Sequence, residues 1–188
     1  TQGVSSAASD VYKRQHPKRG GDRSYTAKPH NIFRPNFATN TPSPAAVLSH
    51  KAAHLLDNLA AQYNGTNNGD LSAAPKIMQL FGWKSRGSIN DALIELLALG
   101  FIELTRQGGR NKCNLYALTW RSIDECKGKL DVSSTRVQSN LWKLENQDKR
   151  DRRFVKAWEH MQAKLKTVPA IRTNVPDIRT SQQKAVRK

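Results

Sequence analysis

Cysteine is scarce in this sequence: a chain of 188 residues has two, Cys113 and Cys126. Two cysteines build no disulfide framework, and their separation fits no zinc motif, which needs cysteine or histidine ligands in closely spaced pairs. We therefore expect two reduced thiols, no bound metal ion, and no secreted domain held together by disulfide bonds.

Long apolar runs are also missing. No stretch approaches the roughly 20 apolar residues that a membrane-spanning helix requires, and no apolar signal segment lies near the first residue. The sequence likewise lacks a glycine-rich phosphate loop, a nucleophile elbow, and a cysteine paired with a histidine. These absences predict a cytoplasmic protein without a membrane span, which is not an enzyme and has no cofactor.

Acidic residues are few, because 15 Asp and Glu stand against 31 Lys and Arg, a net charge of +16. This balance suits a polyanionic partner, and a basic surface that only favours solubility is the alternative. The excess lies in the flanks: Lys and Arg outnumber Asp and Glu by 7 to 2 in residues 1–43, by 8 to 7 in residues 44–126, and by 16 to 6 in residues 127–188. The near-neutral middle segment is therefore the candidate for a packed domain.

The two flanks are predicted to be appendages. Residues 1–43 are rich in Pro, Ser, Thr, Asn and Gly, so they should form a disordered basic arm with too little apolar surface to offset the entropy of ordering. Within this arm, residues 10–15 resemble the translation of a transposon-end sequencing adaptor, and we expect residues 1–15 to be an assembly artefact. Residues 121–166 predict a partly helical basic extension, and residues 167–188 predict a disordered basic tail.

The middle segment, residues 44–120, begins with two predicted helices. Apolar residues recur at helical spacing over 44–63, with Ser43 as the cap and Gly65 at the end. A short second helix is predicted over 73–81 behind Ser72. Its residues expected to face inward are Ile77, Leu80 and Phe81.

A third helix and a hairpin complete this segment. Ser85 is the predicted cap of a helix over 86–99, and Gly100 ends it. The apolar stripe of this helix is Ile89, Leu93, Leu96 and Leu97. The period then changes to two, which predicts strands over 101–106 and 113–119, preceded in the chain by a very short strand at 70–71. The pair Gly108-Gly109 should supply the positive φ angles of the hairpin turn.

The segment 85–104 strongly resembles the recognition helix and first wing strand of bacterial winged-helix regulators. It shares their Ser-rich entry, apolar stripe, glycine at the helix end, and an apolar pair that opens the strand. The resemblance covers about residues 44–120, and residues 63–69 are similar to helix-turn-helix proteins of bacterial genomes and mobile elements. The resemblance implies a winged helix-turn-helix fold, which is mainly α with a small β-hairpin. In such a fold, three helices and a wing bind duplex DNA.

The residue types at the start of the third helix suit this role independently. Arg86 could read a guanine edge and Asn90 an adenine edge, while Asp91 could accept from a cytosine amine. Asp91 and Glu95 also repel phosphate, so the helix should enter the groove by its N-terminus. The predicted DNA-binding residues are Lys84, Ser85, Arg86, Ser88, Asn90 and Asp91 around this helix, and Arg106, Arg110 and Lys112 around the wing.

These features predict sequence-specific binding of duplex DNA, in transcription regulation in a bacterium or mobile element, at the nucleoid. The alternatives are a replication-initiation or maintenance protein of a plasmid or phage, an adaptor that uses a winged helix to bind a protein, and RNA contact. We also expect that the protein can form a homodimer, in which two copies bind two half-sites. The basic helix predicted over 147–166 would either form the dimer contact or lie along the DNA phosphates as an arm.

The pair His50 and His54 is more simply explained as two surface or partly buried histidines than as a metal site.

Overall fold

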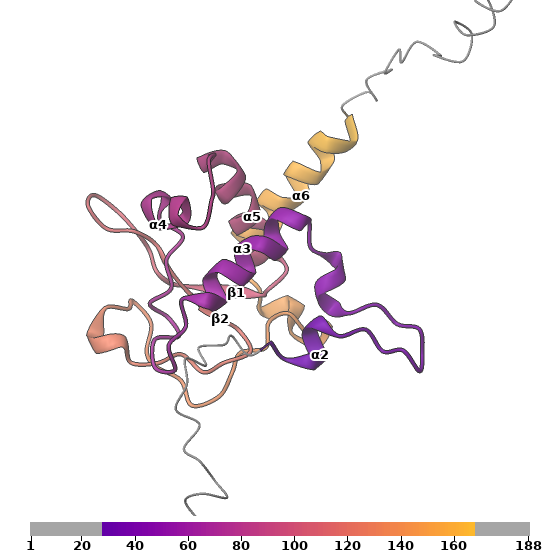
Figure 1. Cartoon of the computed structure of the whole chain (residues 1–188), viewed down its shortest axis with the longest axis horizontal. Helices are drawn as coiled ribbons and strands as arrows, with labels where there is room; N and C mark the ends of the chain where they lie inside the picture. The colour runs from indigo at the N-terminus through magenta and orange to yellow at the C-terminus, as the bar shows by residue number, and fades with distance from the viewer. Residues whose placement is uncertain (1–27, 168–188) are drawn as a thin grey trace, which may run out of the picture.

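The computed structural model describes residues 28–167, which are mainly helical with one two-stranded antiparallel sheet (Figure 1). This confirms the prediction of a mainly helical protein with a small hairpin. No helix in this range is long and apolar enough to cross a bilayer. The elements are α2 (His30–Phe33), the 3-10 turn η1 (Pro44–Val47), α3 (His50–Ala61), α4 (Pro75–Leu80), α5 (Arg86–Ala98), β1 (Ile102–Arg106), β2 (Leu115–Leu118), the 3-10 turns η2 (Cys126–Gly128) and η3 (Leu144–Lys149), and α6 (Arg152–Thr167).

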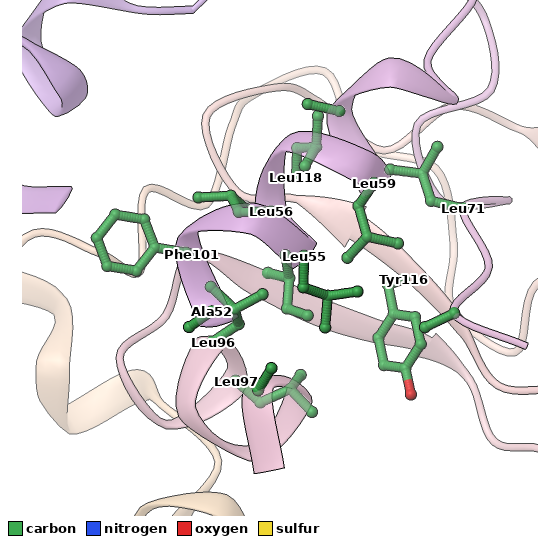
Figure 2. Packing of buried hydrophobic residues seen from close by; sticks show 14 of the residues in the cluster. Ala52, Leu55, Leu56, Leu59, Leu71, Leu96, Leu97, Phe101, Tyr116 and Leu118 are labelled. Atoms are coloured by element: carbon green, nitrogen blue, oxygen red, sulfur yellow. The ribbon is translucent and has the colours of Figure 1, made fainter. Parts of the chain in front are cut away.

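The hydrophobic core is built around α3. Its residues Leu55, Leu56 and Leu59 have no exposed surface, and Figure 2 shows their side chains gathered with those of Leu96 and Tyr116. These side chains come from α3, α5 and β2, so one cluster joins the helices to the sheet. Burial of each such leucine contributes roughly 1.5–3 kcal/mol.

The start of α3 differs from the prediction. A single helix over 44–63 was expected behind Ser43, but residues 44–47 form a separate 3-10 turn and Ser43 makes no side-chain cap. The helix begins behind Ser49, whose Oγ accepts a hydrogen bond from the backbone N–H of Ala52 at 3.2 Å. Two serines could therefore cap this region, and the structure uses the second.

Glu95 of α5 explains this choice. The backbone N–H and the hydroxyl of Ser49 both donate to its carboxylate, at 2.6 Å and 2.7 Å. The side chain of Glu95 is buried. The expectation that Glu95 repels phosphate on the helix surface is wrong, because this acid lies inside the protein and ties the start of α3 to the middle of α5.

Glu95→Ala should destabilise the fold by about 2 kcal/mol, because it leaves two donors of Ser49 without their charged acceptor. Urea unfolding followed by circular dichroism measures this loss. Asp91→Ala, which removes an exposed acid from the same helix, should cost less than about 0.5 kcal/mol. Equal losses for the two variants would mean that the link to Ser49 contributes nothing.

The second helix is shorter than predicted. It was expected over 73–81 with Ser72 as its cap, but α4 begins after Ala74, and the Oγ of Ser72 accepts from the backbone N–H of Ala74 at 3.2 Å. Leu80 was expected to face inward and is instead 87% exposed, while Met78 is fully buried. The other two residues of the predicted face, Ile77 and Phe81, are partly buried against the core, so the prediction is wrong at Leu80 alone, and Met78 is the buried residue that it missed.

The third helix agrees with the prediction at both ends. Ser85 caps α5 by accepting from the backbone N–H of Ser88 at 3.3 Å. Gly100 follows the helix with φ of +76°, and a β-carbon there would lie 2.5 Å from the carbonyl carbon of Leu141. Both the φ angle and the neighbouring backbone require glycine at this position. The expected apolar stripe also packs on the core, with Ile89, Leu96 and Leu97 buried and Leu93 partly buried.

The strands pair as an antiparallel hairpin, with Ile102 opposite Leu118 and a register shift between Leu104 and Arg106. The predicted short strand at 70–71 is present as a single bridge, in which Leu71 and Tyr116 exchange two backbone hydrogen bonds of 3.2 Å and 2.9 Å. β2 therefore lies between β1 and this bridge.

The hairpin turn does not use its glycines as predicted. Gly109 and Lys112 bond to each other through their backbones, and the positive φ angle in the turn belongs to Asn111, at +63°. Gly108 is needed for space, because a β-carbon there would lie 2.6 Å from Oδ1 of Asn114. An asparagine tolerates the left-handed region better than most residues, which explains its place at the turn.

Residues 28–43 are not the disordered arm that was expected. Ile32 of α2 has no exposed surface, and the ring of Phe33 meets that of Trp120 edge to face, with centroids 5.9 Å apart. Lys28 forms an ion pair of 2.7 Å with Asp57 of α3. A short segment with few apolar residues thus packs on the core, because the domain itself supplies the matching apolar surface. The predicted artefact at residues 1–15 and the rest of the arm up to residue 27 lie outside the described residues.

The chain after β2 returns along the domain, and Trp142 packs on the core. Ser139 donates to the carboxylate of Glu103 at 2.8 Å, and burial raises the pKa of Glu103 more than this hydrogen bond lowers it. The backbone N–H of Asn140 donates to the carbonyl of Thr119 at 2.8 Å. This segment is therefore part of the domain.

The predicted basic helix over 147–166 is divided in two. η3 covers its first residues, and α6 follows and packs against α5. Phe154 of α6 lies on the core cluster. The predicted tail after Thr167 lies outside the described residues.

Candidate nucleic-acid interface

A hollow of about 420 Å³ lies where α3 and α5 begin, and we call it the basic hollow. α5 contributes Ser85 and Ser88, which form its capping turn, and the loop before it contributes Lys84. The remaining lining residues are His50, Lys51, His54, Gly82 and Trp83. The N-termini of α3 and α5 therefore both lie at the basic hollow.

The walls of the basic hollow are held by aromatic and amide contacts. The imidazole of His54 stacks on the ring of Trp83, with centroids 5.5 Å apart and an interplanar angle of 24°. The indole nitrogen of Trp83 donates to Oδ1 of Asn58 at 2.7 Å. Trp83 is thus fixed to α3, and it fixes the turn between α4 and α5 at the same time.

The charge of the basic hollow has one sign. Lys51 and Lys84 are exposed cations, and the two histidines add groups that become cationic on protonation. No Asp or Glu is among the described residues that line it. Backbone N–H groups at a helix start also attract anions, so this arrangement can hold a phosphate group of a polyanion.

Arg86, Asn90 and Asp91 form the exposed side of α5. Asn90 also lines a second depression of about 290 Å³, together with Gln107 and Asn114 from the hairpin and Arg153 from α6. The structure thus brings Lys84, Ser85 and Ser88 together in one place. It puts Asn90 in a neighbouring depression at the base of the hairpin, beside the start of α6.

The three predicted wing residues separate into two groups. Arg110 and Lys112 are exposed at the hairpin turn, which lies on the same side of the molecule as α4 in Figure 1. Arg106 differs, because its guanidinium donates to the carbonyl of Cys113 at 3.1 Å and 3.3 Å and to the carbonyl of Lys129 at 3.4 Å. Arg106 therefore braces the base of the hairpin where the strand register shifts, and its contact with DNA stays a prediction.

Sequence reasoning missed Lys51 and Arg153, and it interpreted the two histidines as surface or partly buried residues without a role in binding. The signal for Lys51 was present, since it stands one turn from His54 on the same helix. The signal for Arg153 was absent, because the sequence does not say that α6 packs on α5.

Comparison with known proteins gives no further assignment: no protein-family model, curated protein or solved structure matches this chain.

Proposed function

We propose that residues 44–120 form a winged helix-turn-helix module that binds duplex DNA with sequence preference. α5 is its reading helix and the turn between β1 and β2 its wing. The main support is the basic hollow at the start of α5, beside the exposed Arg86. Phosphates of the DNA backbone would lie against Lys51 and Lys84, and base edges against Arg86 and Asn90.

The exposed surface of α5 favours DNA over a protein partner. An adaptor would need a contiguous apolar patch on this helix, whereas its exposed residues are Arg86, Gly87, Asn90 and Asp91. Its apolar side chains are buried or half-buried against the domain. We therefore propose transcription regulation in a bacterium or mobile element, at the nucleoid, as the role of this binding.

A homodimer remains part of the proposal, because two copies would read two half-sites. The basic helix over 147–166 was the surface expected for it. Phe154 of α6 packs on the core cluster of its own chain, so this side chain would not contribute to a dimer.

Binding of a fluorescent duplex of mixed sequence, measured by anisotropy between 50 and 200 mM salt, tests the proposal. We expect a slope of log K against log salt of about −4. Each neutralised phosphate contributes about −0.9, and about four would be neutralised, by Lys51, Lys84, Arg110 and Lys112. Arg86→Ala should weaken binding to a selected site about 10-fold and relax the preference at one base position.

Arg34→Ala is the matched control, because Arg34 is an exposed arginine that follows α2, away from α4 in Figure 1. It should leave the selected sequence unchanged. If Arg86→Ala and Arg110→Ala both bind DNA as the wild type does at low salt, the proposed reading helix and wing are wrong.

A further inference from the structure

A large cleft of about 860 Å³ lies away from the basic hollow, between η1, the end of α5, η3 and α6. Its walls are mainly apolar, and they include Pro44, Val47, Leu99, Phe101, Trp142 and Trp158. Val47, an apolar residue of the segment 44–63, is 66% exposed at this cleft. An apolar cleft of this size is typical of a site for a small organic molecule.

The charges in the cleft are not balanced. Its single acid, Glu145, lies 3.4 Å from the ammonium group of Lys143 in an ion pair. Arg150 has no carboxylate within ion-pair distance among the described residues. Its guanidinium donates instead to three backbone carbonyls, those of Leu141 at 2.8 Å, Trp142 at 3.1 Å and Lys143 at 3.4 Å.

A guanidinium that is partly buried and bonded only to neutral acceptors still lacks a counter-charge. Burial lowers the pKa of Arg150, which is the effect expected when no anion compensates for lost water. Trp158 also lines the cleft, and its indole nitrogen is buried away from the cleft surface without a hydrogen-bond partner, so Arg150 is the polar group of the cleft on which the argument depends.

We propose that this cleft binds a small organic monocarboxylate, with an apolar body against the side chains of Trp142 and Phe101 and its carboxylate at Arg150. The proposal goes beyond DNA binding and does not depend on it. An apolar anion fits both features of the cleft, because neutral apolar molecules would leave Arg150 without a counter-charge and polar anions would leave the walls uncovered.

Tryptophan fluorescence and calorimetry of the full chain test this with naphthalene-2-carboxylate as the probe and the neutral naphthalene-2-carboxamide as its match. We expect saturable binding of one carboxylate per chain, at least about 10-fold tighter than the carboxamide. Arg150→Gln should reduce this ratio to about two or less. Arg136→Gln, which removes an exposed arginine that does not line the cleft, should preserve it.

If Arg150→Gln does not fold, Val47→Asp tests the same proposal. Val47 is an exposed residue in the wall of the cleft, so its substitution should not disturb the packing of the core. It should weaken carboxylate binding about 10-fold through charge repulsion, whereas Val137→Asp, at an exposed valine that does not line the cleft, should have no effect. Equal affinity for carboxylate and carboxamide, or no saturable binding up to about 1 mM, overturns the proposal. A dimer that Val47→Asp dissociates overturns it too, since the cleft would then be a subunit interface.

Discussion

Reversing the charge of Lys84 and Arg86 together, as Lys84→Glu with Arg86→Glu, should lower the affinity for duplex DNA by about 100-fold or more at 0.1 M salt. Both side chains are exposed, Lys84 in the basic hollow and Arg86 beside it. Each substitution removes a cation from the proposed interface and places a carboxylate next to phosphate. Fluorescence anisotropy of a labelled duplex measures the change.

The matched control is Arg34→Glu with Arg136→Glu, which changes the net charge of the protein equally at two exposed arginines outside the basic hollow and the hairpin turn. This control should weaken binding by no more than about three-fold at the same salt, because distant surface charges are screened. Similar losses in both variants would mean that DNA responds to the total charge, and the proposed interface would be wrong. Loss confined to the first variant would support it.

Asn68→Ala should destabilise the fold by about 3–4 kcal/mol, the largest effect on stability that we expect. Asn68 has no exposed surface. Its amide nitrogen donates to the carbonyls of Leu118 at 3.1 Å and Ser122 at 2.8 Å, and its Oδ1 accepts from the backbone N–H of Leu118 at 2.8 Å. Alanine would leave these backbone groups buried without partners. The midpoint of urea unfolding, at unchanged slope, measures the loss.

Asn64→Ala is the control from the same loop. The side chain of Asn64 is exposed, where its Oδ1 accepts from the backbone N–H of Thr66 at 3.1 Å. Water can replace this hydrogen bond, so the variant should lose less than about 1 kcal/mol. Equal losses at the two positions would show that burial of Asn68 gives its hydrogen bonds no special weight.

Local sequence predicted α5 and its ends well. Ser85 can cap the helix with its own hydroxyl, and Gly100 can adopt a φ angle that other residues resist. The apolar stripe between them then fixes which face is buried, as Ile89 and Leu96 illustrate. Each of these properties belongs to residues close together in the chain, so no knowledge of distant contacts was needed.

The prediction of helix caps and turn residues failed where two nearby residues could each take the same role. Ser43 and Ser49 are both residues that can cap a helix, and the two hydrogen bonds that Ser49 donates to Glu95 decide between them. The hairpin turn offered two glycines, yet Asn111 takes the positive φ angle, while Gly108 is needed for close packing against Asn114. In each case the deciding group comes from another part of the fold or of the turn.

The candidate site shows the same division. The cations of the α5 start and of the hairpin turn were predicted from their positions in the chain, and Lys84, Arg86 and Arg110 are exposed there. The bonds of Arg106 to the carbonyls of Cys113 and Lys129 were not predicted, since Lys129 lies 23 residues further along the chain.

The sequence by itself determined the order of helices and hairpin, the capped start of α5 and the excess of positive charge, because spacing, capping and composition are local properties. The tertiary structure decided which caps, acids and arginines are used inside the protein and which remain exposed. It also joined α3 and α5 around the basic hollow and placed Arg150 at an apolar cleft. The physical reason is that burial and hydrogen bonding between distant segments select among local alternatives that differ by about 1–2 kcal/mol.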